Sequence, residues 1–345
     1  MSSLSAPVGH SEVLSGLWQA RSRGRLPHAL LFEGPSGIGK YHAALWFIQG
    51  VFCESSAAAH FEGPCGTCGP CKRIAAGTHP DFHRLDPLEE ELEKIPVSRI
   101  APRDGGGDSV CDFFALRAME GGMRVVLIRD FERANTQAQN ALLKTLEEPG
   151  PSALLVLVSG RPDLLLETIR SRCVSVRLDA LEKADAELVL RQVGARDEDL
   201  TQLVNWAAGS PGKALELQRE GARDVRDLIA QVLRGECEAL DAAQETLELP
   251  GEFDGKTPTA QTRARTRAAL ELLLDVLRDG LRHQAGSAPA DLAHGDLAEL
   301  SYGKEFLWRA AQKQVVALRG EVELNLSPLG ILDRAFLALP QTKAQ

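Results

Sequence analysis

The stretch that decides the fold is Gly34-Pro35-Ser36-Gly37-Ile38-Gly39-Lys40. It follows the short apolar run Leu30-Leu31-Phe32, which indicates a buried strand, and residues 41–52 then carry apolar side chains at helical spacing. In this context a glycine loop binds phosphate through backbone N–H groups at a helix N-terminus, and the lysine reaches the outer phosphates. The sequence therefore predicts a nucleotide-binding fold with Gly34, Gly37, Gly39 and Lys40 as the phosphate-binding residues.

Two positions around this loop do not suit a magnesium ion. The residue after the lysine is expected to be Ser or Thr, whose hydroxyl binds Mg²⁺, but this chain has Tyr41. A second predicted strand, Val125 to Ile128, is expected to end in an Asp for the metal and then a Glu for the attacking water, but Arg129 and Asp130 follow it. A cation at that position repels Mg²⁺. We interpret these as two independent defects and expect no ATP/Mg²⁺ turnover here, while nucleotide occupancy of the loop stays open.

The rest of the chain divides into an α/β part and a helical part. Helix 137–148 and further strands at 154–158 and 174–176 give an alternation of strands and helices, which implies a parallel sheet covered on both faces. After about Leu178 helical periodicity takes over. The expected elements there are short helices over 184–217, loops at 250–262 and 285–296, a long amphipathic helix at 265–283, and closing helices at 306–318 and 329–339.

Bulk composition narrows the class of protein. The 345 residues allow two or three domains, and 44% hydrophobic residues suit a globular chain that buries real cores. No apolar run approaches the roughly 18 residues that cross a bilayer, and the N-terminus lacks the regions of a signal peptide, so we expect a cytoplasmic protein. The net charge of −9 argues against a dedicated DNA-coating protein.

Four of the seven cysteines form a metal-binding pattern. Cys53, Cys65, Cys68 and Cys71 follow the spacing C-x11-C-x2-C-x2-C, and two-residue gaps bring thiolates onto one tetrahedral centre. We predict a structural Zn²⁺ whose four sulfurs leave no position for a catalytic water. His60 and His79 are alternative ligands that a fourth cysteine makes unnecessary, and a redox or disulfide cluster is the alternative that a cytosolic chain disfavours.

Three further segments together resemble one family. They are NALLKTLEEP at 140–149, IRSRC at 169–173 and GSPGKAL at 209–215. With the cysteine cluster inserted after the loop helix, the chain resembles the clamp-loader branch of the AAA+ ATPases, and in detail its non-hydrolysing subunits in bacterial DNA polymerase III. The resemblance is dense over 24–217 and weak beyond. It implies an AAA+ P-loop domain at 1–178 with a zinc module at about 53–71, a small helical lid domain at 179–219, and an all-helical collar domain at 220–345.

The resemblance also implies a role for Arg172. In this family the arginine of the Ser-Arg-Cys motif points into a neighbour's ATP site, where its planar, permanently charged guanidinium pairs with phosphate oxygens. By pattern alone, a salt-bridged arginine at a helix-to-strand turn is the favoured interpretation of Arg172, and the family resemblance favours the role in a neighbour's ATP site instead. Gly212 stands where ATP-hydrolysing members carry a second arginine. The implied partners are the gamma/tau and delta subunits, the sliding clamp and, through the complex, primer-template DNA, with no membrane.

Two other functions remain open at this stage. The chain can be an active gamma/tau-type ATPase, which Lys40 supports and Tyr41, Arg129 and Gly212 oppose. It can also be a zinc-dependent nucleic-acid-binding protein with a vestigial P-loop, which predicts steeply salt-dependent DNA binding by the chain alone.

Overall fold

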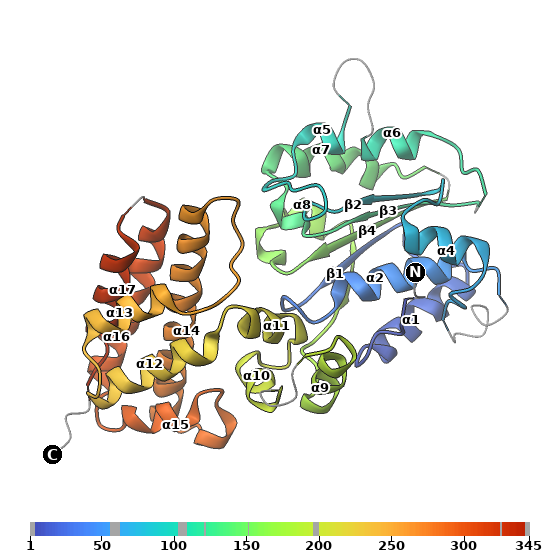
Figure 1. Cartoon of the computed structure of the whole chain (residues 1–345). Helices are drawn as coiled ribbons and strands as arrows, with labels where there is room; N and C mark the ends of the chain where they lie inside the picture. Colours follow the sequence, from blue (N-terminus) through green and yellow to red (C-terminus); the bar gives the residue numbers. More distant parts are fainter. Residues whose placement is uncertain are drawn as a thin grey trace. The chain divides into compact units, whose positions relative to one another are not determined.

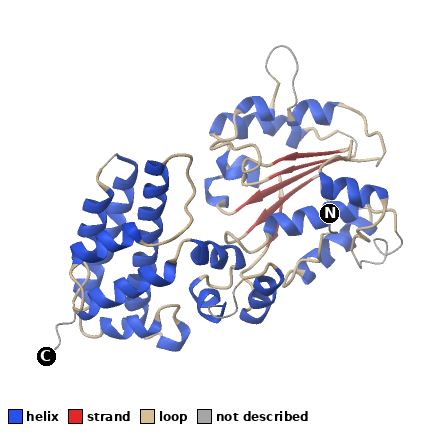
Figure 2. Cartoon of the chain, viewed as in Figure 1, coloured by secondary structure: helices blue, strands red, loops and turns tan. Residues whose placement is uncertain are grey.

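The structure is a computed structural model that describes residues 4–55, 63–102, 109–120, 122–150, 152–195, 200–324 and 326–341. The chain forms two compact units, Met1–Asp185 and Ala186–Gln345, and each is described by itself. Figure 1 labels the elements, and Figure 2 shows that strands occur only in the first unit among the described residues. The finer division into three domains stays a prediction.

The first unit alternates strands and helices, as the sequence predicted. Its elements are α1 (Ser11–Ser22), β1 (Ala29–Glu33), α2 (Lys40–Phe52), α4 (Gly69–Ala76), β2 (Phe82–Leu85), α5 (Val97–Ile100), α6 (Val110–Ala115), β3 (Arg124–Ile128), η1 (Phe131–Arg133), α7 (Thr136–Glu147), β4 (Ala153–Ser159), η2 (Pro162–Leu164), α8 (Glu167–Arg170) and β5 (Val174–Arg177).

Helices make up the second part of the chain. They are α9 (Lys183–Gln192), α10 (Leu200–Trp206), α11 (Pro211–Arg219), α12 (Ala222–Arg234), α13 (Ala239–Glu248), α14 (Pro258–Gln284), η4 (Pro289–Asp291), α15 (Gly295–Ala298), η5 (Glu299–Ser301), α16 (Glu305–Glu321), η6 (Val322–Leu324) and α17 (Pro328–Leu337). No helix in the described ranges combines the length and the apolar character that a membrane crossing requires.

The sheet has five parallel strands in the order β2-β3-β4-β1-β5. Successive side chains of a strand point to opposite faces, so alternate strand residues enter two separate cores. Leu30 and Phe32 of β1 pack with α1, α2 and α4 on one face, whereas Ala29 and Leu31 pack with α5, α6, α7 and α8 on the other. Figure 1 shows these helices on the two sides of the sheet. The loop that follows β1 therefore emerges at the carboxyl edge of a sheet that is covered on both faces.

The structure differs from the sequence-based expectation at several elements. Strand β2 was not predicted, because only its end residues are buried and its centre is His83-Arg84. Helix α14 begins at Pro258, inside the expected loop 250–262, because Thr257 accepts a hydrogen bond from the Ala260 N–H and Pro258 suits the first helical turn. Helices α1, α12 and α13 were also not predicted.

The second unit has its own hydrophobic core, formed by α12 to α17 around residues such as Leu273, Trp308 and Phe336. A buried polar cluster lies beside it. The fully buried His294 accepts a hydrogen bond at Nδ1 from Arg226 Nε (3.3 Å) and donates its backbone N–H to Asp279 (2.9 Å), and its ring lies 5.5 Å from that of Trp206. Burial and the Arg226 charge lower the pKa of His294 to about 4, so this histidine is neutral at pH 7.

Candidate functional site

The predicted phosphate loop lies between β1 and α2 at the carboxyl edge of the sheet. Gly34 has φ 145°, and a Cβ there would lie 2.0 Å from the Leu178 carbonyl oxygen, so only glycine fits. Gly37 (φ 76°) and Gly39 (φ 92°) adopt left-handed conformations that glycine tolerates at no steric cost. Gly39 directly precedes the first turn of α2. The backbone thus has the form that the sequence predicted.

Lys40 is folded back into this loop. It is buried, and its Nζ donates a hydrogen bond to the Pro35 carbonyl oxygen (2.5 Å). Burial lowers the pKa of Lys40, while the carboxylates of Glu132 and Asp130 act in the opposite direction. Glu132 Oε1 accepts a hydrogen bond from the Gly160 N–H at the end of β4 (2.9 Å). Sequence reasoning missed Glu132, since it follows the strand by four positions and matches no expected ligand.

The two residues that replace the magnesium ligands contact each other. The Arg129 guanidinium lies over the Tyr41 ring, with its Cζ 4.7 Å from the ring centroid. Arg129 Nη1 also bonds to Asp86 Oδ2 at 3.1 Å, and Nε lies 3.9 Å from Asp130 Oδ2. Asp86 is 2% exposed, and burial raises the pKa of Tyr41 to about 12. A cation, an aromatic ring and a buried carboxylate thus pack together at the position of the expected metal ligands.

The contact between Arg129 and Tyr41 joins the two positions at which magnesium ligands are replaced. Tyr41 and Arg129 are parts of one packed unit, so they are not independent defects. Arg129 is also not an isolated cation, because Asp86 and Asp130 flank it. Occupied space and committed carboxylates therefore weigh against a metal ion at this position more than net positive charge does. Sequence reasoning missed Asp86, because it follows the unpredicted strand β2.

The four predicted zinc ligands converge. The sulfur atoms of Cys53, Cys65, Cys68 and Cys71 all lie within 4.8 Å of one another. Four sulfurs at about 2.3 Å from a tetrahedral ion lie about 3.8 Å apart, so the cluster is of the right size. The module's residues 56–62, including His60, lie outside the described residues. His79 packs against the Phe52 ring instead, 4.3 Å between centroids. The donor set suits a closed metal site and is compatible with Zn²⁺.

Backbone N–H groups already stabilise negative sulfur in this cluster. The N–H of Cys65 points to Cys53 Sγ and the N–H of Cys68 to Cys65 Sγ, both at 3.4 Å. Hydrogen bonds from the backbone N–H groups of Thr67 and Cys68 lower the pKa of Cys65 to about 6, whereas burial raises the pKa of Cys71. Cys71 is fully buried under α2, where Gln49 Nε2 donates to its carbonyl oxygen (2.9 Å). A metal ion bound by the cluster would supply the charge that lets this buried thiol ionise.

Arg172 follows α8 and is partly exposed, with 36% of its side chain accessible. Its Nη2 donates to Glu147 Oε1 (2.7 Å) at the end of α7, and its Nη1 donates to the Thr168 carbonyl oxygen (3.0 Å). The salt-bridged arginine that the sequence left open is therefore present, at an accessible surface.

Arg172 lies far from the chain's own phosphate loop. The register pairs Leu30 of β1 with Val174 of β5, and the strands are parallel. Gly34 is four residues beyond Leu30, whereas Arg172 is two residues before Val174. Gly34 lies in the loop after β1 and Arg172 in the turn before β5, so the four paired residues of these strands, about 13 Å at 3.3 Å per residue, separate them on opposite edges of the sheet. His28 Nε2, 3.1 Å from the Leu146 carbonyl oxygen, marks the same amino edge.

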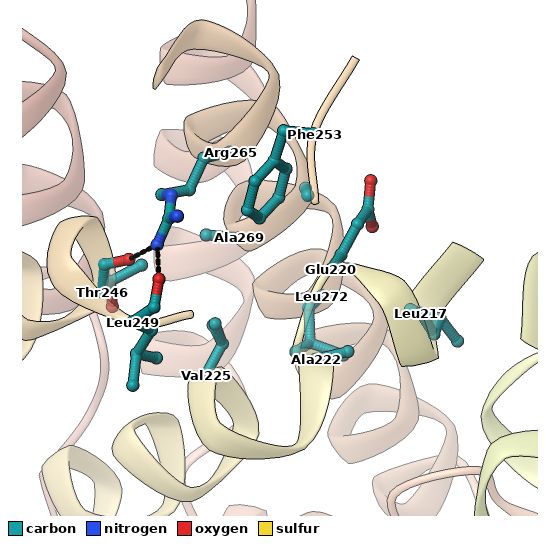
Figure 3. Close-up of a pocket in the computed structure, with 11 residues that line it drawn as sticks. Leu217, Glu220, Ala222, Val225, Thr246, Leu249, Phe253, Arg265, Ala269 and Leu272 are labelled. Atoms are coloured by element: carbon teal, nitrogen blue, oxygen red, sulfur yellow. Dashed lines mark hydrogen bonds between the residues drawn. The ribbon is translucent and has the colours of Figure 1, made fainter. Parts of the chain in front are cut away.

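The helical unit carries a pocket of a different kind (Figure 3). Apolar side chains such as Leu272 line it together with Glu220 and Arg265. The Arg265 guanidinium lies 4.6 Å from the Phe253 ring centroid and donates to the carbonyl oxygens of Thr246 and Leu249. Burial, with the nearby charges of Glu216 and Glu271, raises the pKa of Glu220 to about 7. Lys40, Arg172 and the cysteine cluster lie in the other unit.

Sheet topology and the glycine loop define a P-loop nucleotide fold of the AAA+ type, with a four-cysteine insertion and a helical C-terminal region. The family model described as "DNA polymerase III, delta subunit" matches residues 9–182, and the chain belongs to this family. The similarity is to its delta-prime members, which agrees with the family predicted from the sequence.

The chain aligns in sequence with only part of the length of each individual relative. This chain is 41% identical over 220 residues to the DNA polymerase III subunit delta′ of Pseudomonas aeruginosa, and the alignment covers 64% of this chain and 63% of that relative. It is 32% identical over 216 residues to subunit tau of Escherichia coli, covering 61% of this chain and 31% of that protein. A solved DNA polymerase III gamma subunit-related protein of Thermotoga maritima aligns over 96% of this chain and 98% of its own, at 17% identity and a TM-score of 0.42.

Proposed function

We propose that this chain is the non-hydrolysing stator subunit of a bacterial DNA polymerase III clamp loader, and that Arg172 completes the ATP site of a neighbouring subunit. The partners in this proposal are the gamma/tau and delta subunits. Together they would load the sliding clamp onto primed DNA. Family membership supports assembly into a clamp-loader complex. We expect no ATP turnover at the chain's own phosphate loop.

The observation that carries the proposal is the position of Arg172. It is accessible, and it lies on the opposite edge of the sheet from the chain's own phosphate loop, with the paired strands β1 and β5 between them. An arginine there cannot reach a phosphate in its own subunit, but it can enter a site on an adjoining one. Such an arginine stabilises the charge on the transferring phosphoryl group and contributes roughly 10³–10⁵ in rate.

The chain's own loop supports the non-hydrolysing half of the proposal. The Tyr41–Arg129–Asp86 group fills the position where magnesium ligands are expected. A magnesium ion would supply much of the charge neutralisation at the phosphates, and these committed side chains would not provide its ligands. Gly212 provides no second arginine.

We propose structural roles for the cysteine cluster and for the helical domains. The four thiolates hold a structural Zn²⁺, which ties the end of α2 to the start of α4 and performs no chemistry. Residues 179–219 form the lid and residues 220–345 form the collar, in keeping with a hydrophobic core that begins at Ala222. The cytoplasmic location stays a prediction.

The test uses a complex reconstituted with gamma/tau, delta, the sliding clamp and primed DNA. Arg172→Ala should leave assembly intact and slow clamp-dependent ATP turnover. Arg170→Ala, a matched change at an exposed arginine two positions earlier, should leave turnover unchanged. Equal turnover in the wild-type and Arg172→Ala complexes would refute the proposal.

The similarity to tau keeps a second function open, an active gamma/tau-type ATPase. Nucleotide titration of the isolated chain with Mg²⁺, followed by a phosphate-release assay, separates the two, since only an active ATPase releases phosphate alone. The zinc-dependent nucleic-acid-binding alternative instead predicts tight DNA binding by the isolated chain that weakens steeply with salt.

A further inference from the structure

The guanidinium of Arg172 is held by acceptors from two separate elements. Glu147, the last residue of α7, accepts from Nη2, and the Thr168 carbonyl oxygen of α8 accepts from Nη1. Two bonds at two different nitrogen atoms fix both the position and the plane of the group. Because a guanidinium has five N–H donors, three remain for a phosphate, enough for a bidentate contact.

The two elements that supply these acceptors are themselves locked together. Gln139 of α7 is 3% exposed, and its Oε1 accepts from the Leu166 N–H just before α8 (2.8 Å). Its Nε2 donates to the Ala134 carbonyl oxygen (2.9 Å). Leu142 and Leu146 anchor the same helix in the core. Glu147 therefore projects from a rigid support.

We propose that Glu147 is a positioning residue that orients Arg172 for a phosphate on a neighbouring subunit, an inference that rests on the proposed function. An exposed ion pair contributes little to the free energy of unfolding, so stability does not explain why two acceptors hold this guanidinium. Orientation of the guanidinium does explain it, because a misplacement of about 1 Å in a catalytic group can lower the rate about 100-fold.

The test compares variants in the reconstituted complex. The Arg172-dependent turnover is defined as the wild-type rate minus the rate of the Arg172→Ala complex. Glu147→Ala should lower it about tenfold with the KM for ATP unchanged, because a misoriented arginine affects the chemical step. Glu147→Gln keeps an acceptor oxygen and should restore turnover to within about threefold of wild type. Glu148→Gln, at the exposed neighbouring carboxylate, is the matched control and should match wild type.

A double variant separates positioning from general damage. Glu147→Ala combined with Arg172→Ala should turn over as slowly as Arg172→Ala alone, since Glu147 acts only through that arginine. Thermal unfolding of each isolated variant checks that the fold is intact. If Arg172→Ala is slow but Glu147→Ala equals or exceeds wild type, the inference is wrong and the proposed function stands. If Arg172→Ala itself has no effect, the proposed function fails first.

Discussion

The contact between Arg129 and Tyr41 gives a prediction with a calculable size. In Arg129→Ala the buried Asp86 loses the guanidinium 3.1 Å away but keeps the hydrogen bond from the Leu88 N–H, and the Tyr41 ring loses the cation over its face. Breaking a buried pair costs about 3–5 kcal/mol, and a cation–π contact contributes about 1 kcal/mol. Since 30% of the Arg129 side chain is exposed, we expect the free energy of unfolding to fall by about 3 kcal/mol. At roughly 2–4 °C per kcal/mol for a unit of this size, Tm should fall by about 6–12 °C.

The same contact predicts how a metal site is recovered. Tyr41→Thr with Arg129→Asp supplies a hydroxyl and a third carboxylate beside Asp86 and Asp130. Without metal this double variant should be less stable than wild type, because like charges then crowd a partly buried site. Mg²⁺–ATP at about 100 times its Kd should stabilise it by about 2.7 kcal/mol, or roughly 5–11 °C in Tm.

The assay is thermal unfolding with ATP, with and without Mg²⁺, confirmed by titration calorimetry. Each single variant should show no Mg²⁺-dependent gain, because Tyr41→Thr leaves the cation and Arg129→Asp leaves the ring. Tyr41→Phe is the matched control, since it keeps the aromatic face and should keep wild-type stability. Mg²⁺-dependent stabilisation of the wild-type chain by ATP, or of Arg129→Asp alone, would refute this reasoning.

Further predictions concern the metal cluster and the helical unit. Cys71→Ser should lower the bound zinc from one ion per chain, measured by elemental analysis, and lower Tm, whereas Cys173→Ser, outside the cluster, should keep the ion. Because the pKa of His294 is about 4 when folded and 6.5 when unfolded, the unfolded state binds more protons in this range. Stability of the helical unit should therefore fall by about 3 kcal/mol from pH 6.5 to 4, a fall that His294→Gln should reduce in urea titrations. Glu220 acts in the opposite direction, since its pKa is about 7 when folded and 4.5 when unfolded. The stabilising contribution of Glu220 to the folded state is present below pH 4.5 and is lost as pH rises through 7. Glu220→Gln should therefore raise the free energy of unfolding by about 1–2 kcal/mol at pH 8 and by little at pH 5.

Local signals in the sequence were sufficient for the phosphate loop and the cysteine cluster. Gly34, Gly37 and Gly39 are required by backbone geometry within one turn, and two-residue spacing alone brings Cys65, Cys68 and Cys71 together. The three longer strands β1, β3 and β4 were predicted because each is buried on both faces and carries a continuous apolar run.

What sequence reasoning missed depends on contacts between distant segments. Asp86 became a partner of Arg129 only through the pairing of β2 with β3, and β2 is short and half polar. The pairing of Arg172 with Glu147 needed the packing of α8 on α7. The start of α14 could have been found, because Thr257 followed by Pro258 is a helix-start signal.

In the proposed function, the phosphate loop without turnover and the arginine that acts on a neighbour lie on separate parts of one sheet. The Tyr41–Arg129–Asp86 group belongs to the carboxyl edge, where β2, β3 and the start of α2 meet. Arg172 and Glu147 belong to the amino edge, on α7, α8 and the approach to β5. Under this proposal, side chains that occupy the metal position at one edge leave the arginine at the other edge undisturbed. Since Tyr41 and Arg129 contact each other, we expect that both positions must change together to create a magnesium site.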